Sequence, residues 1–217
     1  GSVIQQTAGE WFDVRVYCAD RFNNIVPTAQ PGVTLTSSDP NDGVDAETGL
    51  GWDPTYQPLL NGTTVFRVAL VTASTWHYLT AEDTDGNPPY YGKRDSSLIW
   101  VNPGPPIKLQ ALLPGEIPKP NTTIGKEGTP ETQQAGQPFY VSVRITDILW
   151  NLVPTAGANV KLITPYDEYD DEPIQSTVNG EANIEKVILT ASQEKTDTSA
   201  PYWEPFKYHI IIATDTG

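Results

Sequence analysis

The sequence predicts an all-β protein built from two tandem β-sandwich domains, over residues 1–104 and 105–217. Residues 8–29 recur at 135–156, with a constant spacing of 127 residues and no gap across 22 positions. Such a fixed period indicates that one structural unit has been copied. The chain also has 20 prolines and 17 glycines, and no stretch has the apolar pattern of an amphipathic helix. Many short strands between dense turn signals are typical of a sandwich or a barrel of strands.

The copied stretch opens with a strand, because apolar side chains share one parity in both copies. They are Phe12, Val14, Val16 and Cys18 in the first copy, and Phe139, Val141, Val143 and Ile145 in the second. This alternation predicts a half-buried strand with these side chains in the core. Cys18 stands where the second copy has Ile145, which favours a buried apolar thiol over a reactive one. An Asp-x-x-x-Asn turn beginning at Asp20 or Asp147 then ends the strand.

Three further pairs of strands follow in the two copies. They are expected at 32–38 and 159–164, at 64–71 and 182–189, and at 76–82 and 208–214. Only the first copy continues, into a last strand at 97–101 and a stiff proline-rich linker at 102–106. Residues 107–113 open the second domain, and 114–134 are expected to form a long surface connection.

The two domains are out of phase with their own repeat. The first domain lacks a first strand matching 107–113, and the second lacks a last strand matching 97–101. A sheet with a missing strand exposes unpaired backbone groups, so a strand from a neighbouring repeat or subunit is expected to complete each open domain. The alternative is that residues 1–7 fill the first slot and the second domain tolerates a short edge.

Several runs of the second domain resemble a known repeat. They are Pro106–Gln110, Leu113–Glu116, Gly128–Pro130, Ala135-Gly136, Asp147-x-x-Trp150-Asn151 and Ala213–Thr216. This pattern resembles the bacterial immunoglobulin-like repeat, which occurs in tandem in long secreted or cell-surface proteins. The resemblance covers nearly the whole second domain and less of the first. The first domain keeps the Ser37–Pro40 loop of such repeats, whereas the second has Thr164–Asp167 instead.

The resemblance implies two immunoglobulin-like β-sandwiches in an extracellular or cell-surface protein. It also implies a non-catalytic structural role, as part of a stalk, an adhesin, a surface layer or a fibre subunit, with neighbouring repeats of the same protein as partners. It fixes no ligand, because sandwiches of this kind host unrelated functions.

The net charge of −14 argues against a nucleic-acid partner, which would need a basic face, and leaves cations as partners. The sequence has no apolar run of about 18 residues, so membrane insertion of this segment is not expected. It has no nucleophile elbow, no Cys/His ligand cluster and no glycine-rich phosphate loop, so no enzyme activity is expected. His77 and His209 occupy matching places in different domains, where core packing is the favoured role.

Two oxygen-rich loops are candidate calcium sites, because calcium takes six to eight hard oxygen ligands. Their candidate ligands are Asp39, Asn41 and Asp45 in one loop, and Asp83, Asp85 and Asn87 in the other. The alternative is a solvated acidic turn whose side chains cap the backbone. The acidic run 167–172 is expected to be solvated.

Loop aromatics suggest a second function, a carbohydrate-binding module that uses Trp150, Tyr202 and Trp203 as a platform. The alternative for these rings is that they cover the open ends of the sandwiches. Asn61 and Asn121 lie in glycan acceptor patterns, which matter only in a host that glycosylates such sites.

Overall fold

The computed structural model describes residues 4–45, 49–165, 167, 169–189 and 209–217. The described residues form short strands joined by turns and loops, and none of them lies in a helix. The predicted all-β class is therefore confirmed. No helix that is long and apolar enough to span a membrane occurs in this part of the chain.

The chain divides into two compact units. The first comprises residues 1–104 and 120–124, and the second comprises 105–119 and 125–217. The grouping of 120–124 with the first unit was not expected from the sequence.

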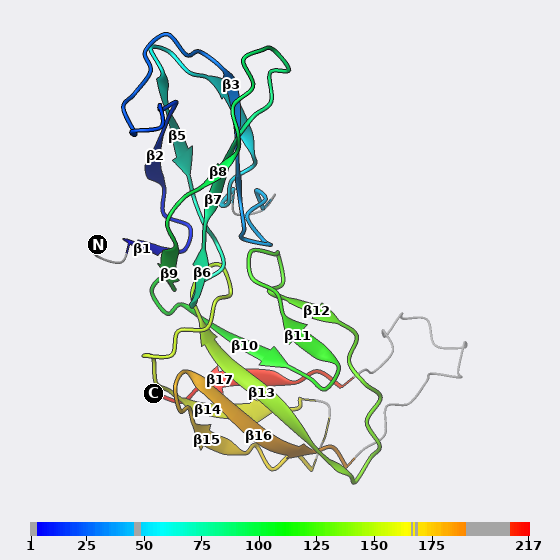
Figure 1. The fold of residues 1–217 in the computed structure, drawn as a ribbon. Helices are drawn as coiled ribbons and strands as arrows, with labels where there is room; N and C mark the ends of the chain where they lie inside the picture. The colour runs from blue at the N-terminus through cyan, green and yellow to red at the C-terminus, as the bar shows by residue number, and fades with distance from the viewer. Residues whose placement is uncertain (1–3, 46–48, 166, 168, 190–208) are drawn as a thin grey trace. The chain divides into compact units, whose positions relative to one another are not determined.

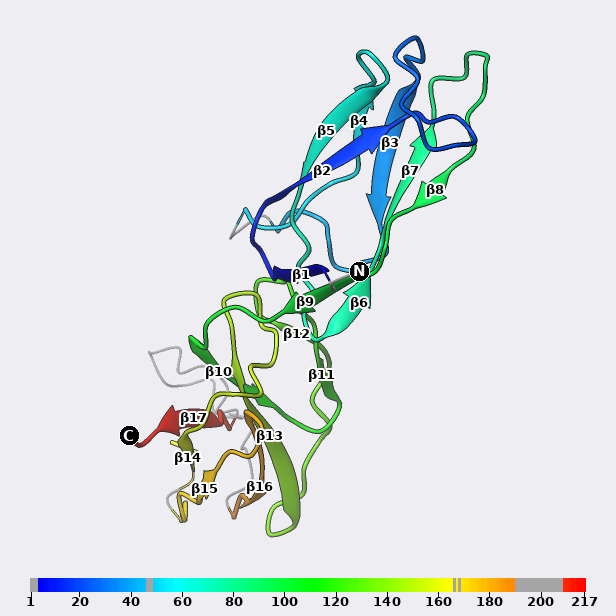
Figure 2. The ribbon, with the colours of Figure 1, turned by 60° about the vertical axis from the view of Figure 1, so that its left-hand side comes forward.

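The described part of the first unit contains strands β1 to β9. They are β1 (Ile4–Thr7), β2 (Phe12–Tyr17), β3 (Gly32–Ser37), β4 (Thr55–Pro58), β5 (Thr63–Val68), β6 (Thr75–His77), β7 (Leu79–Asp83), β8 (Arg94–Asp95) and β9 (Ile99–Asn102). The strands pair in the orders β1–β9–β6, β2–β5 and β4–β3–β7–β8 (Figures 1 and 2). β1 runs parallel to β9, and the other pairs are antiparallel.

The described part of the second unit contains strands β10 to β17. They are β10 (Lys108–Leu112), β11 (Glu116–Pro118), β12 (Lys126–Gly128), β13 (Pro138–Thr146), β14 (Asn159–Ile163), β15 (Ile174–Ser176), β16 (Glu181–Val187) and β17 (Ile212–Asp215). One sheet has the order β10–β13–β16 and another the order β15–β14–β17. The connection expected over 114–134 is not purely a loop, because β11 and β12 pair within it. These strands are only three residues long, too short to show an alternation in the sequence.

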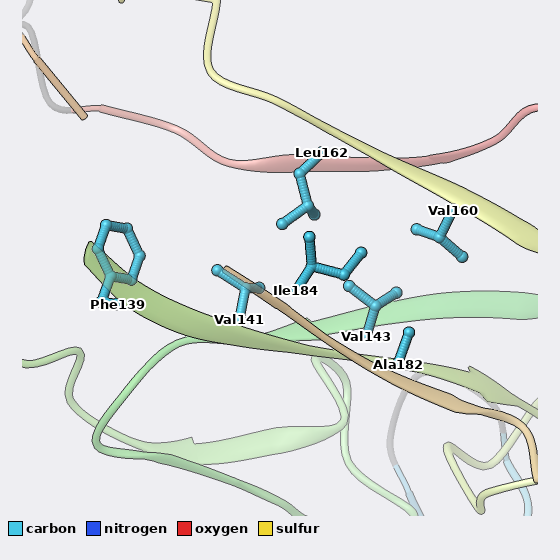
Figure 3. Close-up of a cluster of buried hydrophobic side chains, with 7 residues drawn as sticks. All are labelled: Phe139, Val141, Val143, Val160, Leu162, Ala182 and Ile184. Atoms are coloured by element: carbon cyan, nitrogen blue, oxygen red, sulfur yellow. The ribbon is translucent and has the colours of Figure 1, made fainter. Parts of the chain in front are cut away.

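The core of the second unit lies between its two larger sheets. Side chains of β13 and β16 point toward those of β14 (Figure 3). The cluster consists of Phe139, Val141, Val143, Val160, Leu162, Ala182 and Ile184, all buried. The partly buried Leu109, Ala111 and Leu113 pack against it from β10 and the residue that follows. The burial predicted for the inward parity of β13 is therefore confirmed.

The matching side chains of β2 in the first unit are less buried than those of β13. Phe66 and Val68 on β5 and Leu35 on β3 are buried, so this unit also has a core of its own. Phe12, Val14 and Val16 on β2 are only half-buried, however, so the prediction of full burial is wrong for them. The unit has no strand among its described residues in the place that β10 takes beside β13.

The duplication extends to the register of strand pairing. β2 pairs β5 with Phe12 opposite Val68, and β13 pairs β16 with Phe139, the copy of Phe12, opposite Lys186. In the other sheets, Leu35 lies opposite Ala81, and its copy Leu162 lies opposite Ala213. The two units therefore share the pairing of these four strands, as expected for one unit copied.

Two further expectations need correction. The strand expected over 76–82 is broken at Tyr78, because β6 pairs with β9 while β7 pairs with β3. The alternative that residues 1–7 fill the first slot is wrong for 4–7, because β1 pairs with β9 rather than with β2. In both cases the partner strand is distant in sequence, and the local pattern does not specify it.

The Asp-x-x-x-Asn turn is confirmed in both copies. Asp20 Oδ1 accepts hydrogen bonds from the N–H groups of Phe22 and Asn24, at 2.8 and 2.9 Å. Asp147 accepts the matching bonds from Leu149 and Asn151. Asp20 and Asn24 are exposed in the first unit, whereas Asp147 and Asn151 are buried in the second.

Candidate functional site

The first acidic loop follows β3 and is organised by the buried carboxylate of Asp39. Asp39 Oδ2 accepts hydrogen bonds from the N–H groups of Val71 and Thr72, both at 2.8 Å. Its Oδ1 accepts bonds from the Thr72 hydroxyl at 2.5 Å and from the Asn41 N–H at 3.1 Å. The carboxylate therefore links the loop to the segment after β5. This is the backbone-capping role that the sequence offered as the alternative to calcium binding.

His77 lies next to this carboxylate. Its Nε2 is 4.0 Å from Asp39 Oδ2 and 2.8 Å from the backbone oxygen of Thr72. Because a carbonyl oxygen can only accept, Nε2 carries the proton and donates to Thr72. The ring is buried, so the inward orientation expected for His77 is confirmed. His209, in the other unit, is half-buried.

The remaining polar groups of the first loop have varied surroundings. Asn41 and Asp45 are half-buried. Burial raises the pKa of Asp42, and the hydrogen bond from the Ser37 hydroxyl opposes the rise only in part. The Asn121 side chain donates from Nδ2 to the backbone oxygens of Asn41 and Gly43, at 2.8 and 2.7 Å. These bonds bring 120–124 against the acidic loop within the first unit.

The second acidic loop follows β7 and also caps backbone. Asp85 accepts hydrogen bonds from the N–H groups of Gly32 and Asn87, both at 2.8 Å, and these bonds lower the pKa of Asp85. Asp83 accepts a bond from the Tyr91 N–H at 3.0 Å. Gly32 begins β3, whereas Asp39 follows its end, so a strand of six residues, about 20 Å long, separates the two loops. The two sets of candidate ligands cannot form a single site.

No metal-binding cluster of three or more His, Cys, Asp or Glu side chains occurs among the described residues. The calcium site of either loop thus stays a prediction.

The structure identifies a counterpart of Asp39 that the sequence comparison missed. Asp167 is buried, and its Oδ2 accepts a hydrogen bond from the Leu189 N–H at 2.7 Å. Leu189 follows β16 as Val71 follows β5, so the same anchor recurs with the aspartate displaced by one position. The displacement hides Asp167 from an alignment without gaps. Solvation, expected for 167–172, is wrong for this residue.

A buried ion pair is the second feature that sequence interpretation missed. The Lys186 ammonium, with its side chain fully buried, pairs with the Asp170 carboxylate. Burial opposes ionisation of Asp170, but hydrogen bonds from Lys186 and from the backbone of Thr164 and Glu172 outweigh it, so its pKa is lowered. The signal was present in the sequence, because Lys186 shares the inward parity of Ala182 and Ile184 on β16.

Cys18 is a free cysteine and is buried, as expected. Burial raises the pKa of its thiol, and a hydrogen bond with Tyr91 opposes this effect. The raised pKa keeps the thiol protonated, which is the opposite of what a reactive cysteine requires.

The candidate carbohydrate platform is only partly within the described residues. Trp150 is half-buried, and the Lys108 ammonium lies 3.9 Å from the centre of its ring. Its ring also packs so closely on Gly125 that a Cβ there would lie 2.2 Å from Trp150 Cδ2. Both contacts occupy the ring with groups of its own unit. Tyr202 and Trp203 lie outside the described residues.

The two glycan acceptor asparagines differ in access. Asn61 is exposed in the turn before β5. Asn121 is buried, and its Nδ2, the atom to which a glycan would be joined, already donates to two backbone oxygens. Asn61 is the more accessible of the two.

Comparisons with known proteins give no family. No family model matches the chain, and no curated protein matches it in sequence. Among solved structures, the chain is similar to the apo structure of Bacteroides uniformis beta-glucuronidase 3, with 13% identity over 99% of this chain and a TM-score of 0.30. It is also similar to the FN1–FN3 domains of chicken CNTN1, with 9% identity over 87% of this chain and a TM-score of 0.20. The chain spans 22% and 55% of those two chains, and at these TM-scores neither likeness bears on function.

Proposed function

We propose that the chain consists of two immunoglobulin-like β-sandwiches that serve as non-catalytic structural repeats of an extracellular surface protein or filament. The role is that of a stalk, an adhesin, a surface layer or a fibre subunit. The extracellular location and the immunoglobulin-like class rest on the resemblance of the second unit to bacterial surface repeats.

The observation that carries the proposal is the duplication of strand register. Four strands of one unit pair as their copies do in the other. Both units also use an aspartate in the loop after β3 or its copy β14 to accept a hydrogen bond from the backbone that follows β5 or its copy β16. A copied domain that keeps its own core suits a mechanical array, in which each unit must fold and bear load by itself. The short proline-rich segment at 102–106 is a stiff connector of the kind such an array needs.

Pulling the chain by its two ends tests the proposal directly. Two structural repeats should unfold in two separate events, each releasing about 35 nm of chain for roughly 100 residues. A single event that releases the whole chain, or extension without a force peak, would contradict the mechanical role. Antibodies against the chain should also label intact cells of the source organism, and labelling only after lysis would contradict the extracellular location.

The carbohydrate-binding alternative gains no support from Trp150, whose ring is already in contact with Lys108 and Gly125. It remains a prediction for Tyr202 and Trp203. Binding to a glycan array that disappears on Trp203→Ala and persists in Trp11→Ala would favour this alternative. Wild-type chain that binds no glycan would remove it.

A further inference from the structure

We propose that the outer edge of β2 is an acceptor for one added strand, an antiparallel segment of the type of residues 107–113 from a neighbouring repeat. This inference rests on the proposed function and gives its partner a place and a register. Three observations on the two units carry it.

The first observation is that β13, the copy of β2, has a strand paired on both of its edges. β13 pairs on one side with β16 and on the other with β10, where Ala111 lies opposite Val143. β2 pairs on one side with β5, and none of the described residues forms a strand on its other side (Figures 1 and 2). β1 does not serve, because it pairs with β9.

The second observation is the direction of the backbone groups of β2. The Cys18 N–H donates to the Gly62 oxygen at 2.9 Å. The backbone N–H and C=O groups of Cys18 and of the even-numbered residues of β2 therefore point toward β5. The intervening residues Asp13, Arg15 and Tyr17 therefore present their N–H and C=O groups at the outer edge. Such a row of groups is a template for strand addition.

The third observation is the exposure of the apolar side chains along this edge. Val14 and Val16 are half-buried, whereas their copies Val141 and Val143 are fully buried. In the second unit, Leu109, Ala111 and Leu113 pack on that part of the core. An added strand with apolar residues at these alternate positions would cover the same part of the first unit.

The turn after β2 is also more exposed than its copy after β13. In the second unit the Ile107 N–H donates to the Thr146 oxygen and the Lys108 ammonium donates to the Ile148 oxygen, both at 2.8 Å. The neighbouring Asp147 is buried, whereas its copy Asp20 is exposed. The start of the added strand would therefore cover the turn at Asp20, as residues 107 and 108 contact the turn at Asp147 in the second unit.

The repeat fixes the register of the added strand. Leu109 lies opposite Ile145 and Ala111 opposite Val143 in the second unit. In the first unit the corresponding positions of the incoming segment would therefore lie opposite Cys18 and Val16. A shift by one residue would turn the apolar side chains outward, so this register is the one that buries them.

The test uses the full chain and a synthetic peptide with the sequence of residues 106–113. The peptide should bind one to one, slow amide exchange across 12–19, and raise the melting temperature of the first unit by about 4 °C or more at saturation. The melting temperature of the second unit should not change. A control peptide with Leu109→Asp and Leu113→Asp keeps the length but loses the apolar face, and should not bind.

Two variants of the acceptor make the test specific to the edge. Arg15→Pro removes an outward N–H without touching the β2–β5 ladder and should weaken binding about tenfold or more. Arg15→Ala keeps the N–H and should bind within about threefold of wild type, since its side chain makes no backbone bond. If Arg15→Pro fails to fold, the control peptide and the exchange pattern still decide the matter.

The inference is overturned if the peptide does not bind, if protection falls outside β2, or if the peptide displaces β10 from β13. These outcomes would leave the proposed function standing, because two independent unfolding events under force do not require an added strand. A single unfolding event, by contrast, would contradict the proposed function whatever the peptide does.

Discussion

The clearest quantitative consequence of the structure is an unequal response to the same substitution in the two copies. Val143 is fully buried on β13, and Val16, its copy on β2, is half-buried. Valine to alanine removes about two methylene equivalents, worth roughly 0.8 kcal/mol each when fully buried. With the residual cavity, Val143→Ala should destabilise the second unit by about 2 kcal/mol, within a range of about 1–3. Val16→Ala should cost about half as much or less, because that side chain is only half-buried.

The assay is calorimetry of the full chain, with each transition assigned by hydrogen exchange on peptides from that unit. For a unit of this size, about 1 kcal/mol corresponds to a shift of roughly 4–8 °C in melting temperature. We expect Val143→Ala to lower the transition of the second unit by about 8 °C or more, and Val16→Ala to lower that of the first unit by about half that shift or less. Equal shifts, or a larger one for Val16→Ala, would refute the assignment of a less covered core to the first unit.

Three further predictions concern the polar groups. Asp39→Ala should destabilise the first unit by roughly 2–4 kcal/mol in urea unfolding, because it leaves the buried Val71 N–H and the half-buried Thr72 N–H without their acceptor; a loss under about 0.5 kcal/mol would contradict the anchoring role. The pKa of Asp170 is lowered in the folded state, so its contribution to stability is present above its usual value of 3.8 and is lost as the pH falls through the lowered one. Melts from pH 7 to 2 should therefore show the second unit weakening below about pH 4, and Asp170→Asn should flatten that fall; an unchanged profile in the variant would count against it. The calcium hypothesis predicts a higher melting temperature of the first unit in millimolar calcium than in chelator, and identical melts would remove it.

Much of the local structure was predictable because its determinants lie close together in the sequence. Alternation over four positions placed β2 and β13, since neighbouring side chains of a strand point to opposite faces. The Asp-x-x-x-Asn turn followed from side chains that bond their own backbone two and four residues on. The constant spacing of 127 residues indicated the duplication before any pairing was known.

The candidate site was less predictable, because its geometry depends on segments far apart in the chain. Asp39 was identified as an acidic loop residue, but its partners Val71 and Thr72 come from another strand end more than thirty residues away. Its counterpart Asp167 and Lys186 are charged residue types that are usually exposed to solvent. They are buried because elements distant in sequence pack around them. A charge count therefore overestimated how much of the acidic surface meets water.

The sequence by itself determined where most of the longer copied strands lie, where they turn and that one unit is copied, because periodicity and turn chemistry act over a few residues. The tertiary structure alone decided that β1 pairs in parallel with β9, and that Val16 and Val143 differ in burial although their local sequences match. The physical reason is that pairing and burial depend on which strand lies alongside. β10 lies beside β13, and no strand of the described residues lies on that side of β2.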